Sequence, residues 1–351
     1  MYIREATQED NEELQQLQAR CPQGTTLVVS IVNTPDFFAR VKAYGDYRVY
    51  VAVEDNHIVG STACALRTGM ISGKEEKVGH VFQAFVDPDY RGRRIAGQMH
   101  QFREEYLRQK GAALGYSLII EGNIPSMRYI SRQGFQWHRT LVMPCLAVFK
   151  EMTVGSAYKI RTAVTDDLPS VAGLVNETWL DCELYEPKSA ETLQQFIIRT
   201  PGYDLDNLFV LEEDDTILAC LGFWDWNKVM RITVERMNTK MRLFKLFADL
   251  ARFIRPMPRA PRTGELLRQI MLTPIGFRHP KYLASLLKHV NNLARQRGIG
   301  YIYCVCEQGH PLLSSLRGFT RIDTAIHVYI KYLRENTVLG NKQLFIDGID
   351  L

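Results

Sequence analysis

The residues best suited to chemistry lie in one loop, residues 86–99 (VDPDYRGRRIAGQM), where an apolar run ends and three arginines and a glycine occupy four positions. A helix is predicted to begin within this loop. A helix N-terminus exposes unpaired N–H groups and a partial positive charge, so a loop that curls over it can bind an anion. Gly92 lets the backbone turn, and Ala96 and Gly97 let a ligand approach the first helical turn. We therefore predict a phosphate site built mainly from main-chain groups, rather than the solvated basic turn that arginines alone would indicate.

The elements that must position this loop follow from periodicity. Apolar residues at steps of four, three and four predict a helix over 94–110, ended by Gly111. Strands are expected on either side of it, at 77–87 and 115–121. The first half as a whole is expected to contain helices at 8–20, 35–44, 94–110 and 125–133, and strands at 2–6, 47–54, 57–68, 77–87, 115–121 and 135–150.

In this setting the loop resembles the acyl-CoA-binding motif of the GNAT superfamily of N-acetyltransferases, which runs R/Q-x-x-G-x-G/A after a strand and a short proline turn. Arg91 and Ala96 fit the motif, whereas Arg94 stands where the family usually has glycine. We expect Arg94 to lie in the first helical turn with ordinary helical angles, because a positive φ would be costly for arginine. Downstream, residues 123–135 (NIPSMRYISRQGF) resemble the family's N-x-x-A/S … G-F segment.

The resemblance implies acetyl-CoA as co-substrate and requires no metal. A backbone N–H around Phe85 or Val86, on the strand before the loop, is expected to bind the thioester carbonyl. Arg93 or Arg94 could reach a CoA phosphate. The residues assigned to the cofactor are Phe85, Val86, Arg91, Gly92, Arg93, Arg94, Ile95, Ala96, Gly97, Asn123 and Ser126.

Three side chains are candidates for proton transfer. The family often has a tyrosine seven residues after the asparagine; that position is Ile130 here, and Tyr129 stands one place earlier, so a catalytic and a packing role are weighed equally. Glu121 ends a strand beside the predicted cleft, and His80 lies on the strand that leads to the loop. Taken alone, each is more often structural. Direct attack by the amine needs no covalent enzyme intermediate.

The chain also contains an internal repeat. Residues 3–10 (IREATQED) match 160–167 (IRTAVTDD), and residues 50–66 match 209–225 in form. We predict an acyl-CoA-binding domain at 1–152, a degenerate second copy at 157–333 with an insertion at about 227–266, and a C-terminal tail at 334–351. In the second copy, TPIGFRHPKYL lacks the small residues of the first loop, and its second proline removes a donor. The apolar tail either docks as an interface segment or carries its terminal carboxylate into the active site as a base.

Together these features predict an α/β (α+β) fold with two acyl-CoA N-acyltransferase-like domains, each a mixed, mostly antiparallel sheet flanked by helices. The 351 residues carry a net charge of only +4, which disfavours a nucleic-acid partner, and no apolar run is long enough to span a membrane. Seven scattered cysteines and a polar N-terminus favour a reducing, cytoplasmic location. A homodimer is compatible with the sequence.

The expected function is therefore an acetyl-CoA-dependent N-acetyltransferase that acts on a primary amine, of a small molecule rather than of a protein. The alternative is a non-catalytic acyl-CoA-binding regulatory or interaction module.

Overall fold

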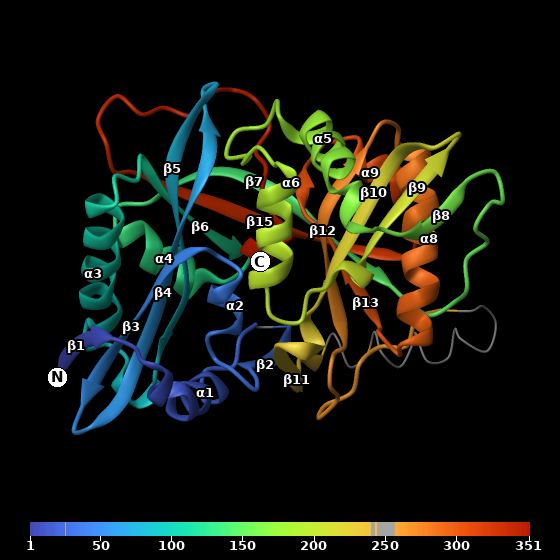
Figure 1. Ribbon diagram of the computed structural model, residues 1–351. Coiled ribbons are helices and arrows are strands. Elements are labelled where there is room, and N and C mark those ends of the chain that lie inside the picture. Colours follow the sequence, from blue (N-terminus) through green and yellow to red (C-terminus); the bar gives the residue numbers. More distant parts are fainter. Residues whose placement is uncertain (25, 240–242, 244–256) are drawn as a thin grey trace.

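The computed structural model describes residues 1–24, 26–239, 243 and 257–351 (Figure 1). Part of the predicted insertion at 227–266 therefore lies outside the described residues. Short 3-10 turns lie at Gln8–Asp10, Pro88–Tyr90, Thr165–Asp167, Leu205–Asn207, Trp226–Lys228 and Gly348–Asp350.

The first half contains every element expected from periodicity and one strand more. The additional strand, β2, is rich in β-branched residues and lies between turn residues, Pro22 and Gly24 before it and Pro35 after it, so the sequence held a strand signal that the prediction missed. The helix α2 is shorter than expected. The elements are β1 (Tyr2–Glu5), α1 (Asn11–Ala19), β2 (Leu27–Asn33), α2 (Ala39–Lys42), β3 (Asp46–Glu54), β4 (His57–Ile71), β5 (Lys74–Val86), α3 (Ile95–Gln109), β6 (Leu114–Ile120), α4 (Ile124–Arg132) and β7 (Gln136–Ala147).

Among the described residues the second half follows the same order with three differences: no strand lies between α5 and α6, β11 lies between β10 and β12, and β14 follows β13. Its described elements are β8 (Lys159–Thr162), α5 (Leu168–Trp179), α6 (Ala190–Arg199), β9 (Leu208–Glu213), β10 (Thr216–Asp225), β11 (Met230–Met237), β12 (Gln269–Phe277), α8 (Pro280–Gln296), β13 (Tyr301–Tyr303), β14 (Cys306–Glu307), α9 (Leu312–Ser315) and β15 (Arg321–Tyr332).

One ion pair recurs at the start of each half and explains the matching sequences there. Arg4 makes two hydrogen bonds to Asp10, both 2.7 Å, and Asp10 also accepts from the backbone N–H of Thr7. Arg161 bonds Asp167 in the same two-pronged way, at 2.6 and 2.9 Å. In both halves the pair closes the corner between a strand and the first helix, so the repeated Arg and Asp are there to fix that corner.

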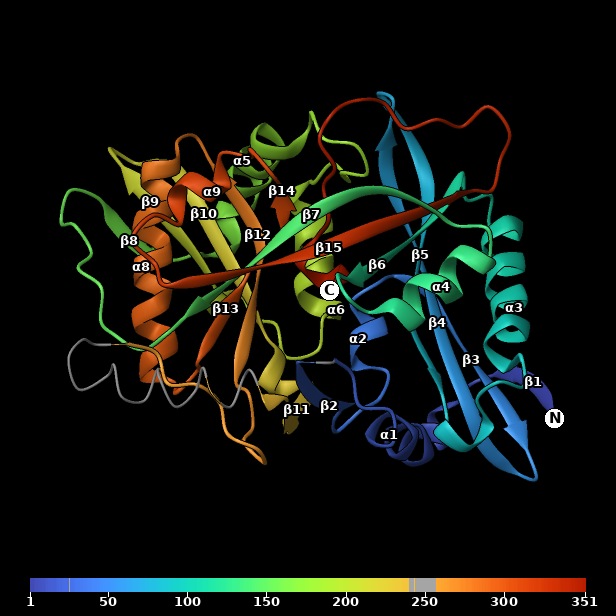
Figure 2. The same ribbon diagram turned by 180° about the vertical axis from the view of Figure 1, so that it is seen from behind.

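All described strands except β2 and β11 form one continuous sheet, in which the two halves exchange their last strands, and β2 and β11 pair with each other in a separate two-stranded antiparallel sheet. The order is β1-β3-β4-β5-β6-β15-β7-β13-β12-β10-β9-β8, with β14 beside β7. The second half's last strand, β15, pairs with β6 of the first half, and β7 pairs with β13 of the second. Figure 2 shows β7 and β15 crossing the middle of the molecule side by side. The predicted mixed, mostly antiparallel sheet flanked by helices is confirmed, while the domain limits at 152–157 stay a prediction.

Helices cover both faces of the first half's sheet. Leu14, Leu17, Phe37 and Val41, from and beside α1 and α2, pack with Phe82 on one face. On the other face, side chains of α3 and α4 pack against β5 and β6 in a separate cluster: Tyr106, Leu107 and Ile130 with Val81 and Ile119. The two strands that these helices cover, β5 and β6, pair over only three positions.

Candidate functional site

The first feature of the site is the separation of β5 from β6. These parallel strands pair over only three positions, the last of which is His80 with Tyr116. Beyond that apex β6 pairs with β15 and β5 with β4, so their facing edges are left without a strand between them. Two separating parallel strands expose main-chain donors and acceptors to a ligand that enters from the open end.

A β-bulge lies in β5 just beyond the apex. Phe82 pairs with Ala63 and Phe85 pairs with Ser61, so Gln83 and Ala84 together face one residue of β4. Gln83 has a φ of 49°, and its side-chain oxygen is buried without a partner. A bulge leaves main-chain groups outside the ladder. The sequence predicts a carbonyl-binding N–H at Phe85 or Val86, and that role stays a prediction; no sequence signal marked the bulge beside them.

The arginine loop forms the open end of this gap. Asp87 accepts a hydrogen bond from the N–H of Asp89 (3.0 Å) and fixes the proline turn. Gly92 has a φ of 84°, and no atom lies within 4 Å of where its Cβ would stand, so the space above the loop is open. No side chain caps the first turn of α3. The N–H groups that an anion would bind are therefore unoccupied by protein acceptors.

The prediction for the backbone of Arg94 is wrong. Arg94 is the N-cap of α3 and adopts a left-handed conformation with a φ of 62°. The helix begins one residue later, at Ile95, so the position retains the positive φ that glycine would adopt most easily. The arginine side chains differ in their contacts: Arg91 Nε donates to the carbonyl of Val86 (3.2 Å), and Arg93 lies 3.6 Å from the carboxylate of Glu54. Within the described residues Arg94 makes no such contact.

The downstream residues of the motif stabilise the start of α4. The side chain of Asn123 accepts from the N–H of Ser126 (3.3 Å), an N-cap hydrogen bond. This contact gives Asn123 and Ser126 a structural role at the start of α4. Their predicted place beside the CoA arm stays a prediction.

Tyr129 links α4 to the loop helix. Its hydroxyl donates to the carbonyl of Ala96 (3.0 Å) and accepts from Arg103 Nη2 (3.0 Å). Arg103 is only 1% exposed and also donates to Thr62 Oγ1. Burial raises the pKa of Tyr129, although the charge of Arg103 opposes the shift. Ile130, at the family's usual tyrosine position, is buried in the core instead. The hydroxyl of Tyr129 thus reaches the first turn of α3, which keeps its predicted acid role open to test.

His80 lies at the apex and is almost fully buried. Its ring stacks between Phe82 and Tyr116, with centroids 4.5 and 4.8 Å away. Nδ1 lies 2.9 Å from the hydroxyl of Tyr44, which in turn donates to Asp350 Oδ1 (2.8 Å). A carboxylate only accepts, so the single hydroxyl proton of Tyr44 goes to Asp350. The hydroxyl oxygen of Tyr44 then accepts from His80, so Nδ1 carries the proton and Nε2 carries the lone pair. Burial, together with nearby arginines, holds the pKa of His80 well below its usual 6.5, so the ring is neutral at pH 7.

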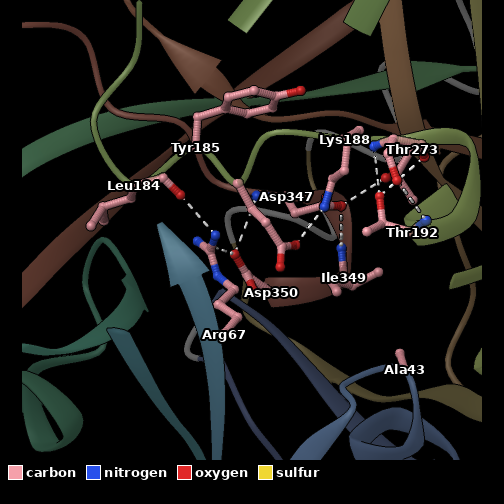
Figure 3. A network of polar contacts seen from close by, with 12 residues as sticks. Ala43, Arg67, Leu184, Tyr185, Lys188, Thr192, Thr273, Asp347, Ile349 and Asp350 are labelled. Carbon is pink, nitrogen blue, oxygen red and sulfur yellow. Dashed lines mark hydrogen bonds and ion pairs between the residues drawn. The ribbon is translucent and has the colours of Figure 1, made fainter. Parts of the chain in front are cut away.

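Asp350 comes from the C-terminal tail, which docks deep in the molecule. Its side chain has no exposure, and Arg67 Nη2 lies 3.4 Å from its Oδ2 (Figure 3). Arg67 also donates to Tyr116 (2.9 Å) and to the carbonyl of Leu184 (2.7 Å). The sequence marked the tail as apolar enough to dock, but it gave no sign that Asp350, Tyr44 and Arg67 would meet His80. These contacts join segments up to 306 residues apart.

Glu121 lies away from this cluster. It follows β6 at the open end of the gap and is exposed, and its N–H donates to the carbonyl of Ala325. The structure therefore brings together His80 with the tail, and Tyr129 with Ala96, but it does not bring Glu121 to the apex.

A cavity of about 290 Å³ lies beside the apex, between the two halves. Its lining includes Tyr44 and Arg67 from the first half and Ile349 from the tail. Tyr44 and Arg67, with His80, Tyr116 and Asp350, form the group of contacts that we call the His80 cluster, and Ile349 lies next to Asp350 in the sequence. The other lining residues are Gly45, Asp46, Leu66, Thr68, Lys77, Glu186, Lys188, Leu193, Phe196, Arg199, Thr273, Pro274 and Asp347.

The corresponding gap of the second half is filled. β12 and β13 also pair over three positions and then separate. Trp179, 3% exposed, donates its indole N–H to the carbonyl of Ile275 (2.7 Å) on β12, and its ring stacks on His310. A bulge occurs at Thr273–Pro274, the place equivalent to Gln83–Ala84, and the proline has no N–H to offer. The side chains therefore occupy the space that the first half leaves open.

Within the described residues, no cluster of three or more His, Cys, Asp or Glu side chains could hold a metal ion. No helix of the described chain is long and apolar enough to cross a membrane. All seven cysteines are free thiols.

Comparisons with known proteins concern the family and the fold. Residues 11–135 match the model of the acetyltransferase (GNAT) family. A search of curated protein sequences found no match. Among solved structures, the chain is similar to N-myristoyltransferase from Saccharomyces cerevisiae with bound myristoyl-CoA (13% identity, TM-score 0.65, covering 96% of this chain and 84% of that one). It is also similar to a GCN5-related N-acetyltransferase from Sphaerobacter thermophilus (13% identity, TM-score 0.57, covering 96% and 97%). At these identities the likeness concerns the fold, and it extends over both halves.

Proposed function

We propose that this chain, whose residues 11–135 match the model of the acetyltransferase (GNAT) family, is an acetyl-CoA-dependent N-acetyltransferase that acts on a primary amine. One observation carries the proposal above the others. The strands β5 and β6 separate beyond His80 and Tyr116, and the uncapped first turn of α3 stands at the open end. This is the arrangement that a long ligand with a phosphate at one end and a reactive group at the other requires.

In this proposal the cofactor is held mainly by main-chain groups. Its pyrophosphate binds the free N–H groups around Ile95, Ala96 and Gly97, where the helix dipole favours negative charge. Gly92 keeps the approach open, and exposed Arg94 adds a charge that pairs with phosphate. The arm of the cofactor lies between β5 and β6, so that the thioester reaches the bulge.

The chemistry then needs no covalent enzyme intermediate. The amine nitrogen attacks the thioester carbonyl carbon and a C–N bond forms. Main-chain N–H groups at Gln83–Ala84 stabilise the negative charge on the carbonyl oxygen. The C–S bond breaks, the amine loses a proton, and the thiolate gains one. Each proton transfer needs a group within hydrogen-bond reach.

His80 is the proposed acceptor of the amine proton through Nε2. Its partner Tyr44 and the carboxylate of Asp350 hold the ring in the required tautomer and stabilise the positive charge that forms. The tail therefore acts as a positioning segment through a side chain. A role for its terminal carboxylate as the base stays a prediction. Tyr129 is the proposed donor to the thiolate.

The second half supplies a wall of the acceptor cavity instead of a second cofactor site. Glu186, Phe196 and Pro274 line the cavity from that half, whereas Trp179 fills the second half's own gap. A cavity of about 290 Å³ suits a small molecule better than a folded protein segment. A cytoplasmic location and a homodimer stay predictions.

The proposal is tested by following free thiol released from acetyl-CoA in a panel of primary amines. Release that depends on both the amine and the enzyme supports it, and His80→Asn should lower kcat by about 10²–10⁴-fold, the usual contribution of general base catalysis. Acetyl-CoA that binds without thiol release with any amine would favour the non-catalytic binding module, and no binding would contradict both.

A further inference from the structure

The charges that line the acceptor cavity are not all neutralised by each other. Among the described residues, Arg67 is paired with Asp350, and Lys188 with Glu186 (2.6 Å). Asp46 forms ion pairs with Lys110 (3.2 Å) and Arg48 (4.0 Å). These pairs account for most of the charge in the lining.

Two of the lining cations, Arg199 and Lys77, have no carboxylate partner among the described residues. Lys77 is exposed, and its Nζ donates to the carbonyl of Lys110 (3.2 Å). Arg199 ends α6 and is partly exposed, and its Nε donates to the carbonyl of Ala43 (2.8 Å). No carboxylate of the described chain lies within 4.0 Å of its guanidinium, so its two terminal nitrogens remain available. The terminal nitrogen Nη1 lies beside Gly45, another lining residue. A guanidinium held in this way presents a fork that fits a carboxylate.

Asp347 is the exception among the anions. It accepts from the hydroxyl of Thr273 (2.7 Å) and from the N–H of Ile349 (Figure 3). Within the described residues no Lys, Arg or His lies within ion-pair distance of it. Asp347 stands three residues before Asp350, and its N–H donates to Asp350 Oδ2 (3.2 Å), which links it to the contacts around His80.

Apolar side chains complete the lining. Leu66 of the first half and Leu193 and Phe196 of α6 border the same space. Among the described residues, a ligand that fills the cavity therefore meets two cations without a carboxylate partner, the guanidinium fork of Arg199 and the exposed ammonium of Lys77, one unpaired carboxylate, that of Asp347, and an apolar wall.

We propose that the acceptor is a small zwitterion, an amine that also carries a carboxylate, with amino-acid chemistry and an apolar side chain. Its carboxylate binds Arg199, and its amino group lies toward Asp347 and His80. Asp347 attracts the ammonium form, which loses one proton to water before the neutral nitrogen attacks, and His80 takes the second proton as the C–N bond forms. This inference rests on the proposed function, since it names the substrate class of that site.

The test compares three matched amines with the full-length enzyme: L-phenylalanine, L-phenylalaninamide and 2-phenylethylamine. All three keep the amine and the ring, and only the first carries a carboxylate. The expected kcat/KM for L-phenylalanine exceeds that for the other two by about tenfold or more, the usual contribution of a charge-assisted hydrogen bond. Arg199→Gln removes this preference and raises KM for L-phenylalanine, while Arg199→Lys retains part of it.

Arg317→Gln is the matched control, because Arg317 is an exposed arginine of the second half that does not line the cavity. It should leave all three rates unchanged. Equal rates for the three amines, or an Arg199→Gln variant that slows all three alike, would overturn the inference while leaving acetyl transfer intact.

If acetyl-CoA binds but no amine is acetylated, the proposed function fails, and calorimetry with the CoA complex decides this inference separately. Binding of L-phenylalanine that is lost in the amide and in Arg199→Gln supports the zwitterion site. Absent or indiscriminate binding overturns it.

Discussion

At the scale of single residues, the most informative position is Arg94. The sequence identified the loop because the small residues and the strand-to-helix context are local signals. It misjudged Arg94 because helix periodicity does not fix the first residue of a helix to within one position. One position decides whether φ is negative or positive, and here it is positive.

Replacing Arg94 by glycine should therefore stabilise the protein. A left-handed conformation costs a non-glycine residue about 1–2 kcal/mol, which the substitution would remove. Glycine also stabilises the unfolded chain by about 0.4–1 kcal/mol through its greater conformational freedom, and this opposes the gain. We expect Arg94→Gly to raise the free energy of unfolding by about 0.5–1 kcal/mol in denaturant titrations. Arg93→Gly is the control. Arg93 has no positive φ, so this variant should be less stable than the unchanged protein. A loss of stability in Arg94→Gly would show that its side chain contributes more than its backbone costs.

A second residue-scale prediction concerns pH. Because burial lowers the pKa of His80 well below 6.5, its base form is present at neutral pH and is lost only as the pH falls through that depressed value. The profile of kcat should thus have no rising limb fixed near pH 6.5. Any rising limb of the kcat profile should instead shift with the pKa of the amine. Measuring the profile with two acceptor amines of different basicity would reveal this shift. A limb that stays near 6.5 for both would contradict the assignment.

At the scale of elements, β5 is the most informative strand. Its apolar pattern predicted a strand that ends at the loop, and the strand ends there. The bulge was not predictable, because it depends on how β4 pairs with β5 and on the space between β5 and β6. The contacts around His80 were hidden for the same reason, since Tyr44 and Asp350 reach it from distant segments.

The bulge suggests a change that makes the first half resemble the second. Ala84→Pro removes a main-chain N–H at the place where the second half has Pro274. If a bulge N–H stabilises the oxyanion, kcat should fall by about 10²–10³-fold while acetyl-CoA affinity changes little. Ala84→Gly keeps the N–H and serves as the control. An unchanged kcat in a folded Ala84→Pro variant would exclude this N–H as the donor.

At the scale of the whole molecule, the exchange of β7 and β15 makes the halves dependent on each other. The repeat was visible in the sequence, through pairs such as Arg4–Asp10 and Arg161–Asp167. The exchange was not visible, because a final alternating strand has the same pattern whichever neighbour it joins. The sequence divides the chain near residue 152, but each half's sheet continues into the other.

A fragment of residues 1–152 should therefore fold poorly by itself. It would leave the edge of β6 without β15, and exposed edges of this kind promote aggregation. We expect no cooperative unfolding transition for this fragment and recovery of a soluble complex when residues 153–351 are produced with it. A monomeric fragment that unfolds cooperatively and binds acetyl-CoA as the full chain does would contradict this view.

The central claim is that one half binds the cofactor and the other does not, and calorimetric titration of acetyl-CoA into the full-length protein tests it most directly. Two variants place a negative charge at equivalent helix starts: Gly97→Glu in α3, where the Cβ has room, and Lys281→Glu in α8. We predict one site per chain, weakened strongly by Gly97→Glu and unaffected by Lys281→Glu. Two sites per chain, or a single site weakened only by Lys281→Glu, would contradict the account.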